Sequence, residues 1–585
     1  MGDKLAPHAL ASPLRLALGA SRQAFTYAGL FSLCINLLLL VPTFYMLSVY
    51  DRVMGSGSEV TLWMVSSITL FLFGVLGALE WVRSRILVAT SMRLDAMLGG
   101  RVFGAAFAQA LSSGGRVVSA QPLSDLLALR QYLSGQGPMA FFDAPWLPIY
   151  LALLFLFHPW FGVVGILSGL VLIALAAWNE WSTKDLLAQA SRESIEASQF
   201  TQRNLRNAEV VEAMGMLPRL RARWQAKQSN MLATQAQASA TAGLIGAVSR
   251  TFRLTIQSMA LGLGAYLALH KEISPATVIA GSILLGRALA PLDSMISSWR
   301  GFAQAREAYS RLDQLLQALP EGDAPMALPP PRGHISLEHL SVTPFGASAP
   351  VLRDIHLVIE PGVQVAVIGP SASGKSTLAR SILGLYRPTL GHVRLDGADL
   401  NQWAREQLGP FIGYLPQDVE LLEGTVAENI ARFGAVDADM VVAAARAAGI
   451  HEMILRLPQG YETKLIGSHV LSAGQQQRIG IARALYGEPQ LIVLDEPNSN
   501  LDQEGEGALS ASLAALKVKG RTVVLVTHRP SALSHVDKVI LMMGGQVGAY
   551  GPRDEVLALL NQHTQKISNA PAAPQAPGAD LKVTA

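Results

Sequence analysis

Hydrophobic residues dominate several long stretches in the first half of the chain. No Asp, Glu, Lys or Arg occurs in residues 23–50, 60–79 and 144–179. At about 1.5 Å of rise per residue, each of the first two stretches can cross a bilayer once as a helix, and the third can cross twice with a turn near His158. Two later apolar stretches, 254–270 and 275–298, bring the predicted number of membrane-spanning helices to six. Such long uncharged runs are rare in the cores of soluble helical bundles.

Basic residues predict which side of the membrane each connection occupies. Arginine and lysine are frequent in residues 81–142 and 181–251 and almost absent from the opposite loops. By the positive-inside bias, these two segments and the N-terminus are cytoplasmic. Both segments have helical patterns, so we expect the membrane helices to continue well beyond the bilayer on that side. Residues 1–23 are expected to form either an amphipathic helix on the membrane surface or a frayed terminus, and the first span is an anchor without a cleavage site.

The composition also indicates a membrane protein. Of 585 residues, 50% are hydrophobic and 15% charged, and the mean hydropathy is +0.31, which is too apolar for an ordinary soluble chain. The net charge is +3, but the basic residues lie where topology requires them and no recognition motif accompanies them, so we expect no nucleic-acid partner. With one cysteine, Cys34, no disulfide framework within the chain is possible, and no cysteine-based metal site is indicated.

The second half of the chain carries a phosphate-binding pattern. Residues 369–377 read GPSASGKST and match G-x-x-x-x-G-K-[ST] between an expected strand and an expected helix. In this pattern backbone N–H groups surround the phosphates of ATP, the lysine reaches the β- and γ-phosphates and the hydroxyl holds Mg²⁺. Lys375 and Ser376 have these two roles. The predicted nucleotide-binding residues are Gly369, Pro370, Ser371, Ala372, Ser373, Gly374, Lys375, Ser376 and Thr377.

An acidic pair ends the apolar run LIVLDEP at residues 491–497. Asp495 closes a predicted buried strand, where its carboxylate can bind Mg²⁺ directly or through water. Glu496 beside it is placed to polarise an attacking water. The two motifs together predict ATP hydrolysis.

The run LSAGQQQR at residues 471–478 resembles the signature motif of the ATP-binding cassette (ABC) ATPases. Three shorter motifs are also similar to that family: Gln417 looks like the glutamine-loop residue, residues 498–502 like the D-loop and His528 like the switch histidine. The resemblance implies that Gln417, Glu496 and His528 act in hydrolysis, with Gln417 also a ligand of Mg²⁺.

The same resemblance implies that two cassettes enclose two ATP molecules, each between the phosphate loop of one cassette and the signature of the other. Ser472, Gly474 and Gln475 would then contact the ATP of the partner subunit, near a helix N-terminus that favours anions. Asp502 of the D-loop is expected at the nucleotide too. Either Phe345 or its neighbour Pro344 falls where the family has an adenine-stacking aromatic residue.

Two departures from the family pattern concern turnover. The third signature position is Ala473 instead of glycine, which adds a methyl group where the backbone approaches phosphate. The family's cross-linking loop is only partly kept, because the expected glutamate is missing after Gly467.

The membrane half resembles the permease/ATPases of type I secretion, in the protease and lipase exporter branch. The resemblance rests on residues 35–62, 126–160 and 283–302 and covers nearly the whole chain. It implies an inner-membrane homodimer that works with a periplasmic adaptor and an outer-membrane channel to export unfolded polypeptides. Many related exporters carry a peptidase-like domain before the first span, for which this chain has no room, so a cargo with an uncleaved C-terminal signal is expected. Secreted proteases, lipases and calcium-binding repeat proteins carry such signals.

Two other functions stay open at this point. A homodimeric exporter of lipids or small amphiphiles is the alternative among transporters, and the membrane-half resemblance argues against it. A membrane regulator that binds ATP with little hydrolysis is the alternative from another class, and the intact Glu496 and His528 argue against it. Arg287 and Asp293 lie within the last span, where a charge facing lipid is costly, so each either pairs with another helix or faces an aqueous path for cargo.

The expected fold is a membrane α-helical bundle of the ABC exporter type with six transmembrane helices, fused to an α/β phosphate-loop ABC ATPase domain. The expected boundaries are a transmembrane domain at 1–319, a stiff Pro-rich linker at 320–333, a nucleotide-binding domain at 334–563 and a disordered tail at 564–585.

Overall fold

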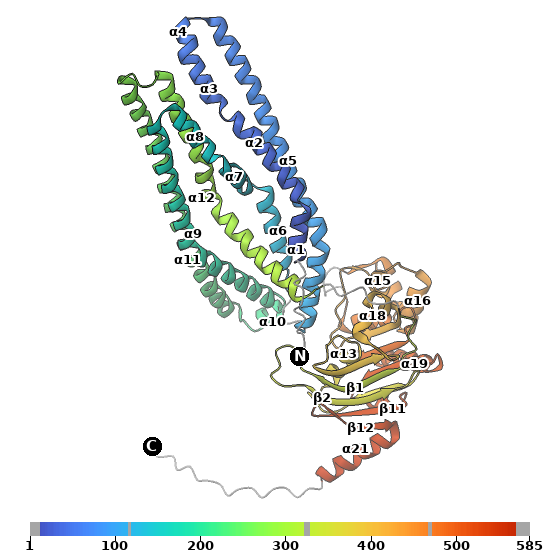
Figure 1. Ribbon diagram of the computed structural model, residues 1–585. Coiled ribbons are helices and arrows are strands. Elements are labelled where there is room, and N and C mark those ends of the chain that lie inside the picture. Colours follow the sequence, from blue (N-terminus) through green and yellow to red (C-terminus); the bar gives the residue numbers. More distant parts are fainter. Residues whose placement is uncertain (1–11, 115–118, 321–327, 466–470, 569–585) are drawn as a thin grey trace, which may run out of the picture. The chain divides into compact units, whose positions relative to one another are not determined.

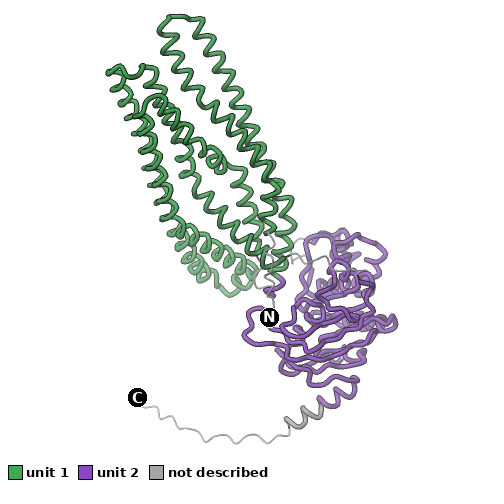
Figure 2. The backbone as a smooth tube through the Cα atoms, in the orientation of Figure 1, with its two compact units in different colours: residues 1–110, 116–320 green, residues 111–115, 321–585 purple. Residues whose placement is uncertain are grey.

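The computed structural model describes residues 12–114, 119–320, 328–465 and 471–568. The chain divides into two compact units (Figures 1 and 2). Unit 1 comprises residues 1–110 and 116–320, and unit 2 comprises residues 111–115 and 321–585.

Unit 1 is a bundle of long helices (Figure 1). Its α-helices are α1 (Pro13–Ala20), α2 (Arg22–Leu38), α3 (Val41–Ser48), α4 (Met54–Ser56), α5 (Glu59–Ser112), α6 (Gln121–Ser134), α7 (Gly137–Asp143), α8 (Leu147–Phe157), α9 (Pro159–Leu205), α10 (Ala208–Ala213), α11 (Leu217–Leu269) and α12 (Pro275–Ala318). A π-helical turn, Val49–Val53, joins α3 to α4, and a 3₁₀ turn, Ala144–Trp146, joins α7 to α8.

Six segments are long and apolar enough to cross a membrane, which confirms the predicted number. They are Arg22–Ser56, Glu59–Ser112, Gly137–Phe157, Pro159–Leu205, Leu217–Leu269 and Pro275–Ala318. The predicted turn falls at His158, which separates α8 from α9 and accepts a hydrogen bond from the Trp160 N–H at 3.3 Å.

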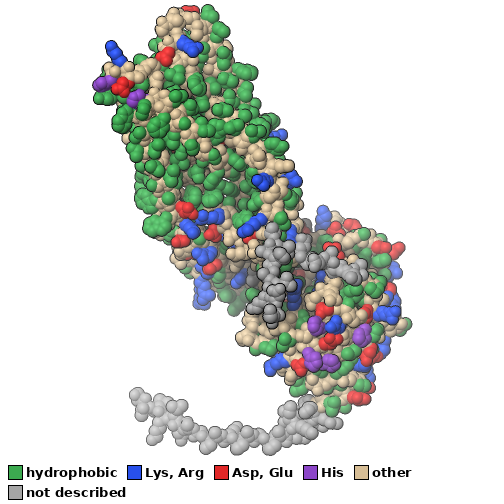
Figure 3. Space-filling view, in the orientation of Figure 1, with side chains coloured by type: hydrophobic (Ala, Val, Ile, Leu, Met, Phe, Trp, Pro, Cys, Tyr) green, Lys and Arg blue, Asp and Glu red, His purple; other side chains and the backbone are tan. Residues whose placement is uncertain are grey.

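The helices continue far beyond their apolar stretches. Helix α5 has 54 residues and α11 has 53, whereas about 20 suffice to cross a bilayer. Hydrophobic side chains cover most of the length of unit 1, and charged side chains gather toward its ends (Figure 3). This distribution agrees with the sequence pattern, in which a single long helix combines an uncharged stretch with a basic segment.

Small residues let the helices of unit 1 approach one another. A Cβ at either Gly264 of α11 or Gly281 of α12 would lie 3.0 Å from the ring of Phe161, which is completely buried. In the described part of the N-terminal segment, Leu14 of α1 is also fully buried, in a cluster with Leu94 of α5 and Leu312 of α12. The apolar face of α1 therefore packs on protein instead of lying on the membrane surface.

Unit 2 contains two main sheets. The larger has the strand order β12-β11-β3-β10-β9-β6, in which β11, β3, β10, β9 and β6 are parallel neighbours. The smaller is antiparallel, with the order β2-β1-β4-β5. The strands are β1 (Ile335–Val342), β2 (Leu352–Ile359), β3 (Gln364–Ile368), β4 (Leu390–Leu395), β5 (Ala398–Asp399), β6 (Ile412–Leu415), β7 (Gly424–Thr425), β8 (Lys464–Leu465), β9 (Leu491–Asp495), β10 (Thr522–Val526), β11 (Lys538–Met543) and β12 (Gln546–Pro552).

The α-helices of unit 2 are α13 (Lys375–Ile382), α14 (Arg405–Leu408), α15 (Val426–Ile430), α16 (Ala438–Ala447), α17 (His451–Leu455), α18 (Ala473–Leu485), α19 (Gln503–Val518), α20 (Pro530–Leu533) and α21 (Arg553–Ser568) (Figure 1). Among them, α13, α18 and α21 contact strands of the larger sheet. Strands β3, β9 and β10 are buried along their whole length, as expected for parallel strands covered on both faces.

Two expected boundaries differ from the structure. Helix α21 continues past His563 to Ser568, because the sequence there keeps good helix formers such as glutamine and lysine, and residues 569–585 lie outside the described residues. In the expected linker, Leu328 packs against the core of unit 2 and Pro331 is buried. The end of that segment is therefore docked on the cassette and is not a solvated spacer.

Candidate functional site

The predicted ATP residues converge because four parallel strands end at the same edge of the larger sheet. The phosphate loop follows β3, Glu496 follows β9, His528 follows β10 and Gln417 follows β6. In the parallel registers Val526 pairs with Asp495 and with Val367, and Leu415 pairs with Leu494. Ligands of open α/β sheets bind at the carboxyl ends of the strands.

The phosphate loop needs its two glycines. Gly369 has φ +149°, and a Cβ there would lie 2.2 Å from the Met542 carbonyl oxygen. Gly374 has φ +97° and directly precedes α13, and a Cβ there would lie 2.9 Å from Leu352. The loop backbone is thus curled tightly at the N-terminus of a helix, where exposed N–H groups favour phosphate. The Lys375 ammonium donates to the carbonyls of Gly369 and Pro370, at 2.9 Å each.

Ser376 and Asp495 place two hard oxygen atoms next to each other. The Ser376 hydroxyl donates to Asp495 Oδ1 at 3.2 Å, while Asp495 Oδ2 is buried without a hydrogen-bond partner among the described residues. Burial raises the pKa of the Asp495 carboxyl, and the nearby Ser376, Arg380 and Lys375 oppose that shift. An orphaned buried carboxylate oxygen beside a serine hydroxyl fits Mg²⁺, which is bound in such sites by one or two protein oxygens together with substrate phosphates.

Glu496 and His528 lie side by side. Glu496 Oε1 is 3.6 Å from His528 Nδ1, and the Glu496 N–H donates to the Val526 carbonyl at 2.9 Å. Glu496 has φ +50°, an uncommon conformation for a side chain without local backbone bonding and one often found at active sites. Gln417 is exposed and lies just beyond the end of β6. In the sheet, β6 and β10 are the two neighbours of β9, so Gln417 and His528 follow strands on opposite sides of β9.

The signature residues belong to a different surface of the same unit. Ser472 caps α18 through a reciprocal capping box with Gln475. A Cβ at Gly474 would lie 2.7 Å from the Asn500 carbonyl oxygen. These three residues line a polar cavity of about 460 Å³ together with Asn500 and Asp502, and none of the phosphate-loop residues takes part in it.

Asp502 also has a structural role. It caps α19 by accepting the Gly505 N–H at 2.9 Å and forms an ion pair with Arg478 of α18. The Gly505 N–H and then Arg478 hold the pKa of the Asp502 carboxyl below its usual range. Phe345 is 56% exposed in the loop between β1 and β2, and that loop ends beside the phosphate loop, where Leu352 meets Gly374. Gly467 of the cross-linking loop lies outside the described residues.

Comparisons with known proteins agree with this geometry. The family described as "ABC transporter" matches residues 352–499, and "ABC transporter transmembrane region" matches residues 25–290. The type I secretion system ATP-binding protein PrsD of Rhizobium meliloti (strain 1021) is 46% identical over 544 residues, which cover 92% of this chain and 93% of PrsD. The chain belongs to the ABC transporters of type I secretion systems.

Two further similarities complete the picture of this transporter. The cyclolysin secretion/processing ATP-binding protein CyaB of Bordetella pertussis is 31% identical over 89% of this chain and 74% of its own length. A solved structure, the ATP-bound form of a bacterial Atm1-family ABC exporter, superposes with a TM-score of 0.80 at 20% identity and covers 94% of this chain and 99% of its own. The transporter is thus a multi-pass membrane protein with the ABC exporter fold, whose ATPase couples hydrolysis to transport.

The membrane unit of the transporter contains a polar cavity of about 740 Å³. Arg287 of α12 lines it, is exposed, and has no ion-pair partner in the part of the chain that the structure describes. Asp293 is different, because it pairs with Arg253 at 3.3 Å and accepts from the Ser249 hydroxyl at 3.0 Å. The two charged residues of the last span therefore differ: Asp293 links α12 to α11, and Arg287 faces the cavity.

A buried network on the wall of this cavity was not predicted. Arg83 of α5 pairs with Asp143 of α7 at 2.9 Å and donates to the Ser32 hydroxyl of α2 at 2.9 Å. Asn36 donates to Asp143 at 2.8 Å, and the Tyr150 hydroxyl donates to Asn36 Oδ1 at 2.9 Å. The sequence offered one signal, since Arg83 and Asp143 lie near the ends of uncharged stretches, but a pairing between distant helices cannot be read from it.

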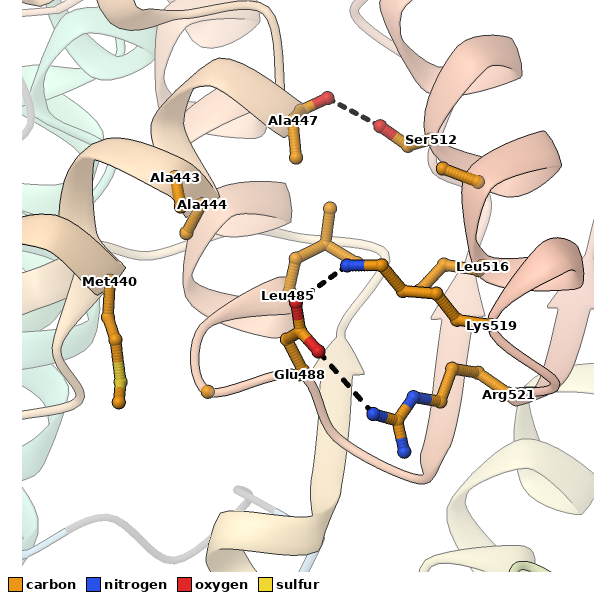
Figure 4. Close-up of a pocket in the computed structure, with 12 residues that line it drawn as sticks. Met440, Ala443, Ala444, Ala447, Leu485, Glu488, Ser512, Leu516, Lys519 and Arg521 are labelled. Carbon is orange, nitrogen blue, oxygen red and sulfur yellow. Dashed lines mark hydrogen bonds and ion pairs between the residues drawn. The ribbon is translucent and has the colours of Figure 1, made fainter.

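A separate groove of about 500 Å³ lies in unit 2 among α16, the end of α18 and α19. Its lining is largely apolar, and Glu488 joins Lys519 at 2.6 Å and Arg521 at 3.5 Å at one side (Figure 4). The groove contains none of the predicted nucleotide residues, so it is not part of the ATP site.

Proposed function

We propose that this protein exports unfolded polypeptides across the bacterial inner membrane as the ABC transporter of a type I secretion system. The single observation that carries the proposal is the 46% identity to a type I secretion ATP-binding protein over nearly the full length of both chains. The convergence of Lys375, Asp495 and Glu496 at one sheet edge supports an active ATPase. The cargo class that the resemblance favours is a polypeptide with an uncleaved C-terminal signal, such as a protease, a lipase or a calcium-binding repeat protein.

The working unit in this proposal is a homodimer that binds two ATP molecules with Mg²⁺. Each Mg²⁺ would be held by Ser376, Asp495 and Gln417 together with the phosphates. The separation of the signature cavity from the phosphate loop within one chain supports this arrangement, because Ser472, Gly474 and Gln475 need a second copy to reach an ATP. A periplasmic adaptor and an outer-membrane channel would complete the path, with the ATPase and the N-terminus on the cytoplasmic side.

The chemistry assigned to this chain's residues follows from their positions. The phosphate-loop N–H groups and Lys375 bind and orient the phosphates. Glu496 would accept a proton from the attacking water. His528, whose Nδ1 lies 3.6 Å from Glu496 Oε1, would hold the γ-phosphate and that water in place. Mg²⁺ would neutralise charge on the phosphate oxygens.

The polar cavity that Arg287 lines is the proposed contact for cargo in the membrane unit. An arginine without an ion-pair partner among the described residues can form ion pairs with acidic side chains of an extended polypeptide or donate hydrogen bonds to its backbone carbonyls. Asp293 serves as a matched comparison on the same helix, because its charge is already satisfied by Arg253.

The test compares the secreted proteome of cells with the wild-type protein, with no protein, and with Arg287→Glu. We expect one or a few polypeptides to disappear from the medium without the protein and to fall strongly with Arg287→Glu, while ATP binding by the purified variant is unchanged. Arg287→Lys, which keeps the charge, should retain most export. An unchanged secreted proteome, together with ATP-dependent lipid flipping in vesicles, would favour the lipid-exporter alternative.

A further inference from the structure

A second cavity of unit 1 has a strongly basic lining. It has a volume of about 360 Å³ and lies between α9, α11 and α12. Arg250 of α11 and Arg300 of α12 line it, together with Asn179 of α9 and Trp299 of α12. No Asp or Glu is among the described residues that line it.

Of the three acidic groups closest in sequence to this lining, two are already paired with other arginines, and the third, Asp185 of α9, is exposed and does not line the cavity. Asp293 pairs with Arg253, and Glu180, next to Asn179, pairs with Arg306 at 2.9 Å. Arg250 and Arg300 are both exposed and have no ion pair within the described ranges. The cavity therefore carries two uncompensated positive charges, which favours an anionic ligand.

Two polar atoms in the cavity wall also lack partners. Asn179 is only 2% exposed, and its Oδ1 has no hydrogen-bond partner in the described part of the chain. The indole Nε1 of Trp299 is buried and equally without a partner there. Buried polar atoms are normally hydrogen-bonded, so the wall offers one donor and one acceptor beside the two arginines.

The position of the cavity along the helices indicates where its ligand comes from. Asn179 ends the uncharged stretch 144–179, and its neighbours Trp178 and Trp181 are 49% and 82% exposed. Exposed tryptophans at the end of an apolar span mark the level of the lipid headgroups. Gly243 and Gly246 line the cavity, and an added Cβ at either would meet nothing within 4 Å, so there is open space beside α11.

We propose that this cavity binds the headgroup of an anionic phospholipid. The phosphate oxygens accept hydrogen bonds from Arg250, Arg300 and the Trp299 indole, and a headgroup hydroxyl donates to Asn179 Oδ1. Phosphatidylglycerol has both groups. Basic pockets between transmembrane helices are suited to such headgroups. This cavity shares only Ser297 with the lining of the cavity that contains Arg287, and the proposal does not depend on the identity of the cargo.

The experiment measures binding of short-chain phosphatidylglycerol to the purified full-length protein by native mass spectrometry. The test variant is Arg250→Gln with Arg300→Gln. The matched control is Arg219→Gln with Arg221→Gln, which removes two exposed arginines of α11 outside the cavity. Trp299→Phe removes only the indole donor and keeps a ring beside Phe302, whose centroid lies 5.1 Å from that of Trp299.

We expect the dissociation constant of phosphatidylglycerol to rise about fivefold for each arginine removed and about 25-fold for both. Trp299→Phe should weaken binding by less, and the control should leave it unchanged. Equal binding by the double variant, or equally tight binding of phosphatidylcholine by the wild type, would overturn the proposal. Displacement by inorganic phosphate at concentrations similar to those of the lipid would show a free-phosphate site and would overturn the lipid assignment. Loss of cargo binding in the double variant without loss of lipid binding would assign the cavity to the polypeptide.

Discussion

At the scale of single residues, the ATP site depends on side chains whose surroundings differ sharply. Asp495 is completely buried, whereas His528 is largely exposed and Glu496 lies between these extremes. Burial suits a metal ligand, because a fixed carboxylate in a dry position holds a cation without competition from water. Partial exposure fits the roles proposed for Glu496 and His528, which require contact with a water molecule and a phosphate that change during the reaction.

Replacement of Glu496 by Gln should separate ATP binding from hydrolysis. The amide has the shape of the carboxylate but cannot accept the proton, so we expect turnover to fall roughly 100-fold or more while ATP still binds. Phosphate release and nucleotide binding by the purified protein measure the two effects. Lys375→Ala is the comparison, since it should lose both. Near wild-type turnover of Glu496→Gln would remove the role assigned to this glutamate.

The raised pKa of Asp495 predicts how the stability of the protein depends on pH. Its folded-state pKa is raised by burial, so its contribution to stability is fully present below the unfolded-state pKa and is lost as the pH rises through the raised folded-state pKa. At neutral pH without nucleotide, Asp495→Asn should therefore raise the melting temperature of the protein, by about 2–4 °C for each 1 kcal/mol gained. The same variant should lose the stabilisation by ATP that depends on Mg²⁺.

Melting curves from acidic to neutral pH, with and without Mg²⁺ and ATP, check this prediction. The control is Asp439→Asn, which changes an exposed carboxylate on α16 and should follow the pH dependence of the wild type. A lower melting temperature for Asp495→Asn than for the wild type at neutral pH would contradict the destabilising effect of this buried charge.

At the scale of elements, the contact between the start of α18 and the segment before α19 controls the signature surface. Gly474 lies against the Asn500 carbonyl, and Arg478 of α18 pairs with the cap of α19, Asp502. These contacts therefore link the two helix starts directly. A change at either end should alter how the signature is presented to a second cassette.

Gly474→Ala tests this coupling. The new methyl group would lie 2.7 Å from the Asn500 carbonyl oxygen, so the backbone has to shift, and we expect a strong loss of ATPase activity and a loss of about 1–3 kcal/mol of stability. Ala473→Gly is the matched control one residue away. Ala473 is exposed, so this change should cost at most about 1 kcal/mol of stability and should keep or increase turnover. A larger loss of turnover in Ala473→Gly than in Gly474→Ala would exclude the proposed contact.

At the scale of the whole molecule, the expected dimer assigns each ATP to two chains. A mixed dimer of one Lys375→Ala subunit and one Ser472→Arg subunit places both changes in one site and leaves the other intact. We expect hydrolysis up to about half of the wild-type rate if the sites act independently, and almost none in either variant homodimer. Tandem purification with two different tags provides the mixed dimer. If the mixed dimer is as inactive as the two variant homodimers, the signature does not act on the partner's ATP, or one site cannot hydrolyse ATP without the other.

The amino-acid sequence by itself determined the features that depend on local order. Long apolar stretches, most of them uncharged, predicted the six spans and the turn at His158, because the length of an apolar helix largely decides whether it can cross a bilayer. Motif order fixed the phosphate loop, since Gly369 and Gly374 are required wherever this curled backbone occurs. The buried strand ending in Asp495 was also predicted from local sequence, because an apolar run leads directly to that residue.

Only the tertiary structure decided which distant groups meet. The roles of Arg287 and Asp293 were left open by sequence, and packing of α11 on α12 assigned Asp293 to Arg253. The Arg83–Asp143 pair and the basic cavity at Arg250 and Arg300 were also invisible, because each joins helices far apart in the chain. Charge compensation depends on distance in space, and a sequence pattern carries no information about which of several arginines is left without a partner.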